Sequence, residues 1–412
     1  MNFEYFIARR IARSKDHKSS VSGPIIKIAI AAIAIGTIVM LIAIATGIGL
    51  QRKIKEKVSA FHGDIIISNY DTNFSFDSQI PISINQEFYP EFNLVPGIKD
   101  IQVTALKGGV IRTEETFEGI VVKGVDADYD FSHFEQYLKE GRLPDYSGNL
   151  NAEILISEYL ANRLDLKVGD KVATYFVNND SERPTRTRGF DLVGIYNSGF
   201  QEFDEQFLVA DIRHIQRLNK WEPDQIGSFE VFVEDFDKLS ETSAAVYENI
   251  DSELNAISIR EKYFSIFEWL DLFDFNIYLI IGIMIVIAGI NMITALWVLI
   301  LERTQMIGTL KALGSSDWSI QKVFLYNAGY IILRGLFWGN LIGLGLIAIQ
   351  WQFGVFEYPD PEIYYMKEAP VYLNAFYILA LNAGTLALCL LMLWGASYTV
   401  TRIAPIKAIR FQ

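Results

Sequence analysis

Few residues in the sequence have the type and spacing needed for a catalytic or metal site. The histidines are scattered along the chain, at His17, His62, His133 and His214. Neither an H-E-x-x-H nor a G-x-S-x-G motif occurs, and the nearest likeness to a phosphate-binding loop, Gly119 to Gly124, is followed by Val125 instead of lysine. We therefore expect no catalytic residue, no bound cofactor and no metal in this chain. Energy for any active process must come from another protein.

Two further features bear on chemistry. Glu202, Asp204 and Glu205 lie close enough in sequence to bind a cation, although a solvated loop is the simpler interpretation. The only cysteine is Cys389, so no disulfide can form within the chain. Neither feature predicts an enzyme.

The elements that dominate the sequence are four long stretches without a charged residue: Ile28–Leu50, Phe275–Leu301, Gly335–Phe356 and Ala369–Thr401. Each exceeds the roughly 20 residues that a helix needs to cross about 30 Å of hydrocarbon. The first could be a cleaved signal peptide, but its apolar run is longer than the usual 7–15 residues, which favours an uncleaved anchor. We predict four transmembrane helices.

Charge predicts the orientation of these helices. Segments 1–27, 302–322 and 402–412 together hold twelve Lys/Arg and four Asp/Glu, whereas 351–371 holds one and four. Because basic loops stay in the cytoplasm, both termini and the 302–322 loop are expected inside. The segment 51–274 is then outside and carries 22 basic and 41 acidic residues, which argues against nucleic acid as a partner.

The expected organisation follows from these boundaries. It comprises an amphipathic N-terminal helix in 1–23, transmembrane helices in 24–50, 275–301, 323–350 and 372–401, an outer α+β domain with a helical stalk in 51–274, a cytoplasmic loop in 302–322, an outer loop in 351–371 and a cytoplasmic tail in 402–412. The N-terminal helix is basic and amphipathic, which favours a position on the inner membrane surface over a solvated tail.

The outer domain alternates short apolar runs with helical patterns. Strands are predicted at Ile65–Ser68, Ile101–Leu106, Ile120–Val125, Glu153–Ile156, Lys171–Val177, Phe190–Tyr196, Phe207–Ala210, Phe229–Val233 and Ala256–Ile259. Helices are predicted at Ser157–Leu164, Asp211–Leu218 and Asp237–Leu254. The polar segment Asn178–Gly189 indicates a projecting hairpin or loop.

The loop "ERTQMIGTLKALGSSDWSIQKVF", Glu302–Phe324, predicts a short amphipathic helix between two membrane helices. One face carries Met306, Ile307, Leu310 and Leu313. Gly314 suits a left-handed helix end, and Ser315 or Ser316 suits the start of the next helix, with Asp317 in its first turn. The apolar face needs a cover, which is either the lipid headgroup layer or a groove in a cytosolic partner.

Small and polar residues in the spans predict helix contacts. Gly335, Gly339 and Gly343 repeat at four-residue spacing, which suits close packing within the chain or at a subunit interface. The amides Asn291, Asn340 and Asn382 occupy one span each and are expected to face other helices. Arg334 is expected at the inner membrane interface, where its side chain can reach water.

The same loop resembles the coupling helix of FtsX/MacB-type ABC transporter permeases. Further stretches resemble the lipoprotein-releasing (LolC/LolE type) branch, in that family's order: "GLQRKIKEKVSAFHGDIII" (Gly49–Ile67), "VVKGVD" (Val121–Asp126), "EGRLP" (Glu140–Pro144), "ILISEYLANRLDLKVGDKV" (Ile154–Val172), "FDLVGIYNSGFQEFD" (Phe190–Asp204), "YYMKEAPV" (Tyr364–Val371) and "APIKAIR" (Ala404–Arg410). "LDLFDFN" (Leu270–Asn276) is more acidic than the family pattern, and "IATGIGLQ" (Ile44–Gln51) replaces its usual Met-Asn-Gly.

The resemblance implies a permease of the bacterial inner membrane whose outer domain is periplasmic. Its partners would be a cytosolic ATPase that uses ATP and Mg²⁺, a second permease subunit, a lipoprotein substrate, membrane lipid and a periplasmic lipoprotein chaperone. The ATPase would engage Glu302, Arg303, Met306, Ile307, Leu310, Lys311, Leu313 and Gly314, and Arg183 and Pro184 are candidates for recruiting the chaperone. Alternatives are a MacB-like exporter and an FtsX-like protein that controls a cell-wall hydrolase.

Overall fold

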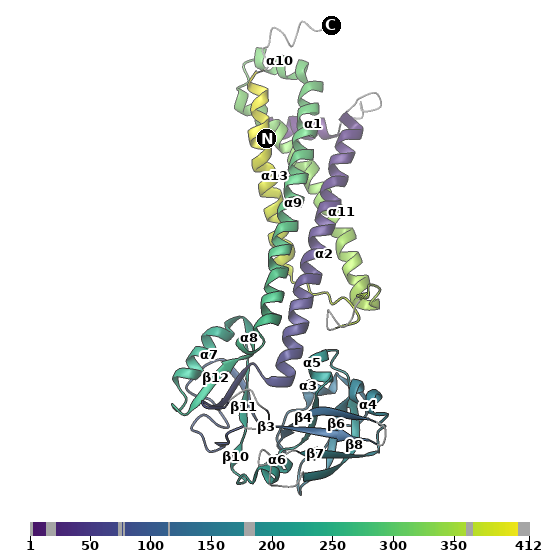
Figure 1. Cartoon of the computed structure of the whole chain (residues 1–412). Helices are drawn as coiled ribbons and strands as arrows, with labels where there is room; N and C mark the ends of the chain where they lie inside the picture. Colours follow the sequence, from purple (N-terminus) through teal and green to yellow (C-terminus); the bar gives the residue numbers. More distant parts are fainter. Residues whose placement is uncertain are drawn as a thin grey trace. The chain divides into compact units, whose positions relative to one another are not determined.

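The computed structural model describes residues 3–13, 22–72, 76, 79–113, 116–176, 186–359 and 366–402. The chain divides into two compact units. The first comprises residues 1–51, 269–357 and 368–412, and the second comprises residues 52–268 and 358–367. The first is mostly helical, and the second contains the sheet (Figure 1).

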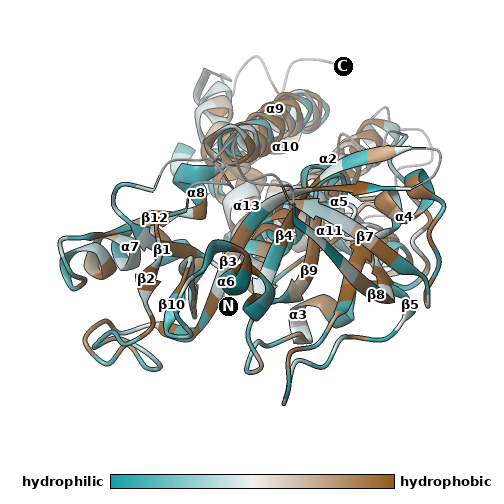
Figure 2. Ribbon diagram, turned by 60° about the horizontal axis from the view of Figure 1, so that its bottom comes forward, coloured by the Kyte–Doolittle hydropathy of each residue, from teal (hydrophilic) through white to brown (hydrophobic). Residues whose placement is uncertain are grey.

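The helices of the first unit are long enough and apolar enough to cross a membrane four times. Its elements are α1 (Phe3–Arg13), α2 (Ser22–His62), α9 (Phe264–Glu302), α10 (Thr304–Ala312), α11 (Asp317–Phe353), α13 (Ala375–Ser397) and the 3₁₀ helix η3 (Tyr398–Arg402). Both α2 and α9 continue into the second unit. Figure 2 shows these long helices largely in the hydrophobic colour, as lipid contact requires.

The second unit is built on a ten-stranded mixed sheet. Its strands are β1 (Ile65–Asn69), β3 (Ile98–Arg112), β4 (Phe117–Val125), β5 (Leu138–Gly141), β6 (Glu153–Ser157), β7 (Lys171–Phe176), β8 (Arg186–Tyr196), β9 (Phe207–Asp211), β11 (Ser228–Val233) and β12 (Leu254–Ser258), with a separate pair, β2 (Ile82–Ser83) and β10 (Gln225–Ile226). The helical segments of this unit are α3 (Ser132–Glu135), α4 (Glu158–Leu164), α5 (Gln201–Asp204), α6 (Ile212–Asn219), η2 (Phe236–Lys238), α7 (Leu239–Glu248) and α8 (Ile259–Lys262).

Strand order closes part of this sheet on itself. The main order is β12-β1-β11-β3-β4-β9-β6-β8-β5, and β7 pairs with both β3 and β8. Six strands, β3-β4-β9-β6-β8-β7, therefore form a closed ring in which β4–β9 and β6–β8 are the parallel pairs. Every residue of β9 and β11 is buried, as expected for strands covered on both faces.

A strand is present at each of the nine predicted positions, whereas β2, β5 and β10 were not predicted. Several predicted boundaries are corrected. Strand β3 extends over Ile98–Arg112, and β12 ends at Ser258, before Ile259 begins α8. The helix predicted at Asp237–Leu254 ends at Glu248, because Asn249 and the Asp251 turn break it before β12 begins at Leu254. The segment predicted as the loop Asn178–Gly189 is already strand from Arg186, where Arg186 pairs with Phe176 of β7. The chaperone candidates Arg183 and Pro184 lie outside the described residues.

Candidate coupling site and the contacts that hold it

The turn between α10 and α11 has the geometry that its sequence predicts. Gly314 adopts a left-handed backbone with φ of +89°. Its amide donates to the carbonyl of Lys311, and the amide of Ser315 donates to the carbonyl of Leu310, both at 3.0 Å. This pair of hydrogen bonds is a Schellman helix end. The side chain of Ser316 then accepts from the Ser319 amide and begins α11.

The apolar face of α10 is covered by the chain itself. Ile307 is fully buried in a cluster that includes Ile320, Phe324 and Val400, and Met306 and Leu310 pack against the same cluster. Neither alternative from the sequence, lipid or a partner groove, therefore applies to Ile307. The reason is that α10 lies across the end of the helix bundle, where neighbouring helices of the same chain are available (Figure 1).

The opposite side of this loop is exposed and partly apolar. Leu313 is 79% exposed and Trp318 is 49% exposed. Together with four exposed neighbours they form what we call the docking surface, which comprises Glu302, Gln305, Thr309, Leu313, Gly314 and Trp318. Trp318 was not predicted from the sequence to be part of this surface. An exposed aromatic residue in the first turn of the helix after the glycine could have indicated it.

Two basic residues of the loop, Lys311 and Arg303, are at least partly buried. The side chain of Lys311 is only 10% exposed and forms an ion pair with Asp317 at 2.8 Å. Arg303 connects α9 and α10, and its Nε is buried without a hydrogen-bond partner among the described residues. Both residues were predicted to serve coupling, and the structure places Lys311 in the contact between helices instead of on the docking surface.

Helix α1 packs on the start of α11. Glu4 accepts a hydrogen bond from Ser319 at 3.0 Å and lies 3.9 Å from the amine of Lys322. The rings of Tyr5 and Tyr326 meet edge to face at 6.1 Å. A backbone hydrogen bond and, after it, the bond from Ser319 lower the pKa of Glu4, which favours its charged carboxylate beside Lys322. The N-terminal helix thus holds the coupling loop from a second side.

The three glycines of α11 lie against α2 of the same chain. A Cβ atom at Gly335 would come within 2.7 Å of the Cβ of Ile33, and one at Gly339 within 2.6 Å of the Cβ of Thr37. Gly343 approaches Leu41 in the same way. In the structure this face of α11 packs against α2 of the same chain, which is one of the two contacts that the glycine spacing suits.

Two of the three predicted membrane amides pair with each other. The side chains of Asn340 on α11 and Asn382 on α13 exchange hydrogen bonds of 2.7 and 3.0 Å. Pairing satisfies polar groups that lipid cannot satisfy. Arg334 is exposed, and its guanidinium lies 4.4 Å from the ring centroid of Tyr330.

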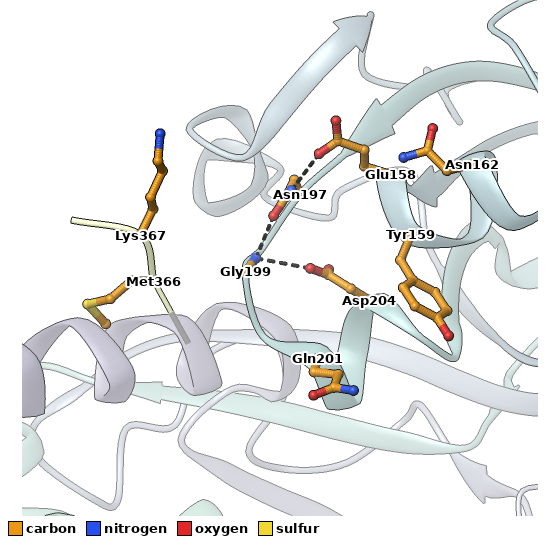
Figure 3. Close-up of a pocket in the computed structure, with 9 residues that line it drawn as sticks. All are labelled: Glu158, Tyr159, Asn162, Asn197, Gly199, Gln201, Asp204, Met366 and Lys367. Atoms are coloured by element: carbon orange, nitrogen blue, oxygen red, sulfur yellow. Dashed lines mark hydrogen bonds between the residues drawn. The ribbon is translucent and has the colours of Figure 1, made fainter. Parts of the chain in front are cut away.

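The acidic residues near Asp204 form a structural turn. Asp204 is buried and accepts hydrogen bonds from the Ser198 hydroxyl at 2.7 Å and the Gly199 amide at 3.0 Å. Burial raises its pKa despite these bonds. The same turn lines a cavity of about 370 Å³, in which Glu158 accepts from Asn197 (Figure 3). The described residues hold no cluster of three or more potential metal ligands.

The end of α2 is fixed within the second unit by a buried ion pair. The amine of Lys123 on β4 donates to the carbonyl of Phe61 in the last turn of α2 and to Glu230 on β11, at 2.8 Å for the latter. The side chains of Lys123 and Glu230 are 2% and 4% exposed. Burial lowers the pKa of Lys123, while Glu230 opposes that shift. The ring of Phe61 contacts Phe134, Tyr137, Tyr196 and Phe203.

Comparison with known proteins places the chain in a family. A family model described as MacB-like periplasmic core domain matches residues 28–248, and one described as FtsX-like permease C-terminal matches residues 278–405. The chain is 20% identical to the lipoprotein-releasing system transmembrane protein LolE of Haemophilus influenzae, over 99% of this chain and 98% of that protein. It is 21% identical to LolC of Neisseria meningitidis serogroup B over 100% of both.

Among solved structures, the periplasmic region of MacB from Actinobacillus actinomycetemcomitans is similar to 48% of this chain, over 88% of that chain, with 14% identity and a TM-score of 0.33. That likeness is too weak to carry an argument. The family assignment depends instead on the two sequence models, the first of which covers more than half of the chain. Similarity to the LolC and LolE proteins extends over the full length of the chain. The chain belongs to the FtsX/MacB-like superfamily of ABC transporter permeases.

Proposed function

We propose that this permease couples ATP hydrolysis by a separate ATPase subunit to the extraction of lipoproteins from the inner membrane toward the outer membrane. The observation that carries the proposal is the two-sided coupling loop. One side of α10 is buried in the helix bundle, and the other side leaves the docking surface open. A helix held in this way can receive force from a partner and pass it to the membrane helices.

The docking surface suits a cytosolic ATPase for chemical reasons. Leu313 and Trp318 flank the open turn at Gly314, and tryptophan is enriched among the residues that dominate protein interfaces. Polar neighbours such as Gln305 and Thr309 supply a hydrogen-bonding rim. In this proposal both termini and the coupling loop are cytoplasmic, and the second unit is periplasmic.

Lipoprotein extraction requires force. Each buried CH₂ of an acyl chain contributes about 0.8 kcal/mol to membrane anchoring, so a protein with several acyl chains does not leave a bilayer spontaneously. In our proposal a second permease subunit completes the membrane cavity, and a periplasmic chaperone receives the lipoprotein. The relatives named lipoprotein-releasing system proteins support this substrate class.

The docking surface is tested by changing its two large apolar residues. Leu313→Asp and Trp318→Ala should each reduce the ATPase retained on the purified full-length permease about tenfold or more, as truncation of a central interface residue does. The matched control is Trp351→Ala, which removes a 77% exposed tryptophan from the far end of α11. Normal ATPase retention by both loop variants would contradict the proposed surface.

The substrate class needs its own measurement. Permease complexes isolated from native membranes should co-purify with lipoproteins and a soluble lipid-binding chaperone. Co-purification with an outer-membrane duct would support a MacB-like exporter instead, and co-purification with a wall hydrolase would support an FtsX-like regulator. Either result would overturn the assignment to lipoprotein release while leaving the ABC permease assignment intact.

A further inference from the structure

Lys311 lies on the coupling helix but turns away from the docking surface. Its side chain is 10% exposed, whereas Thr309 on the same helix and Leu313 directly after it are exposed. An ammonium group that leaves water must be compensated by hydrogen bonds or charge. The contacts that compensate Lys311 come from outside its own helix.

Three acceptors surround the amine of Lys311. It lies 2.8 Å from Oδ1 of Asp317, and it donates to the carbonyls of Val400 at 3.0 Å and Thr401 at 3.3 Å. An ammonium group has three N–H donors, so it can serve several acceptors at once. The amine therefore joins three elements: α10, the first turn of α11 and the 3₁₀ helix η3 that ends the last membrane helix.

Electrostatics favours a cation at this point. The last carbonyls of a helix carry partial negative charge, and Val400 and Thr401 lie in η3 directly after α13. Asp317 adds a full negative charge, and its hydrogen bond to the ammonium is charge-assisted. Val400 is also buried in the same apolar cluster as Ile307. Apolar contact alone lets two helices slide, whereas the directed bonds of Lys311 fix their relative position.

We propose that Lys311 is a positioning residue that makes the ends of α11 and α13 move together with the coupling helix. The inference depends on the proposed function, because it concerns how force applied at the docking surface reaches the membrane. Lys311 itself then does not contact the ATPase. A push on α10 is transmitted directly to two membrane helices through one amine.

The test compares Lys311→Met with Lys311→Arg in the full permease–ATPase complex, reconstituted in lipid nanodiscs. K311M should retain the ATPase and its hydrolysis rate, while lipoprotein released per ATP falls about tenfold, the factor expected when a charge-assisted hydrogen bond is lost. K311R should restore most of that ratio, because a guanidinium also presents several N–H donors. Deuterium uptake of the Tyr398–Arg402 peptide should rise in K311M and not in K311R.

Asp317→Asn provides a milder second variant. It weakens one contact of the amine and leaves the two carbonyl contacts, so release per ATP should fall less than in K311M while the complex still assembles. If K311M does not assemble with the ATPase, a wild-type value of lipoprotein released per ATP in D317N overturns the inference. Loss of ATPase retention in an otherwise folded K311M would also overturn it, because Lys311 would then be a docking residue.

The outcomes separate the inference from the function on which it depends. A wild-type complex that hydrolyses ATP and releases no lipoprotein contradicts the proposed function, and the deuterium uptake of η3 then still tests the link made by Lys311. If K311M leaves both the deuterium uptake of η3 and the release per ATP unchanged, the inference about Lys311 is wrong while the proposed function stands.

Discussion

Among the described residues three helices end at a glycine with a left-handed backbone, Gly63, Gly314 and Gly354, and the surroundings of the first two differ sharply. Gly63 follows α2 with φ of +65°, and Gly314 follows α10 with φ of +89°. A Cβ atom at Gly63 would come within 2.9 Å of the Cβ of Glu230 and 3.2 Å of the Val231 amide nitrogen. A Cβ atom at Gly314 would meet nothing within 4 Å.

The difference separates a tightly enclosed joint at Gly63 from an open turn at Gly314. Near Gly63, the Lys123–Glu230 pair, the Phe61 aromatic contacts and Asp64, which accepts from the Val233 amide at 2.8 Å, join α2 to the sheet. At Gly314 the chain turns in the open between two helices. A rigid joint suits the transmission of motion, and an open turn suits the binding of a partner.

The largest expected effect comes from breaking the buried pair at the rigid joint. Lys123→Met leaves the carboxylate of Glu230 buried without its partner, and removing one member of a buried ion pair typically destabilises by about 3–5 kcal/mol. The double variant Lys123→Met/Glu230→Gln should recover most of this loss, because no uncompensated charge remains. Pulse proteolysis of the full chain in urea, with cleavage detected from fragments of the second unit, measures the free energy of unfolding of both variants.

The control for that prediction is an exposed ion pair on α2, the helix that the buried pair holds. Lys53 lies 3.0 Å from Glu56, with side chains 48% and 39% exposed. Lys53→Met should change the free energy of unfolding by about 0.5 kcal/mol or less, because water screens exposed pairs. Equal losses in the Lys53 and Lys123 variants would show that the joint at α2 is not held by its buried charge.

An intermediate effect is expected from crowding at Gly63. Gly63→Ala adds the strain of a left-handed alanine, about 1–2 kcal/mol, to a steric clash with β11, so the second unit should lose about 2–4 kcal/mol. Gly148→Ala is the matched control in the same unit, because Gly148 has φ of +90° and an open Cβ position. Gly148→Ala should be destabilised only by the strain of a left-handed alanine. The same proteolysis assay compares the two variants. Equal losses in the free energy of unfolding would show that crowding at Gly63 does not contribute.

Sequence reasoning succeeded where the signal is local. Apolar runs with β-type residues predicted nine of the twelve strands that the described residues form, and missed the short strands β2, β5 and β10. The glycine at 314 and the serine at 316 predicted the helix end and helix start that the structure has. The FtsX/MacB-like assignment likewise followed from motifs read along the chain. Each of these signals lies within a few consecutive residues.

Contacts between distant segments could not be predicted in the same way. The spacing of apolar residues identified the apolar face of α10. It did not identify the residues that pack against this face, such as Phe324 and Val400. The glycine spacing in α11 predicted a close helix contact but not that α2 provides it. The closure of six strands through β7, and the pairing of Lys123 with Glu230, depend on register between strands far apart in sequence.

Of the three principal variants, Gly314→Val has the smallest expected effect on stability and is the most informative for function. Because the Cβ position is open, the change costs only the left-handed backbone, about 1–2 kcal/mol, and the first unit should remain folded. The turn itself should change shape, since valine avoids positive φ, so α10 and α11 no longer present Leu313 and Trp318 in one orientation. Lipoprotein release per ATP should then fall, while Gly314→Asn, which tolerates this backbone, should stay near wild type. If the valine variant were fully coupled, the open turn would be a simple connection between helices, and the contrast with Gly63 would concern stability alone.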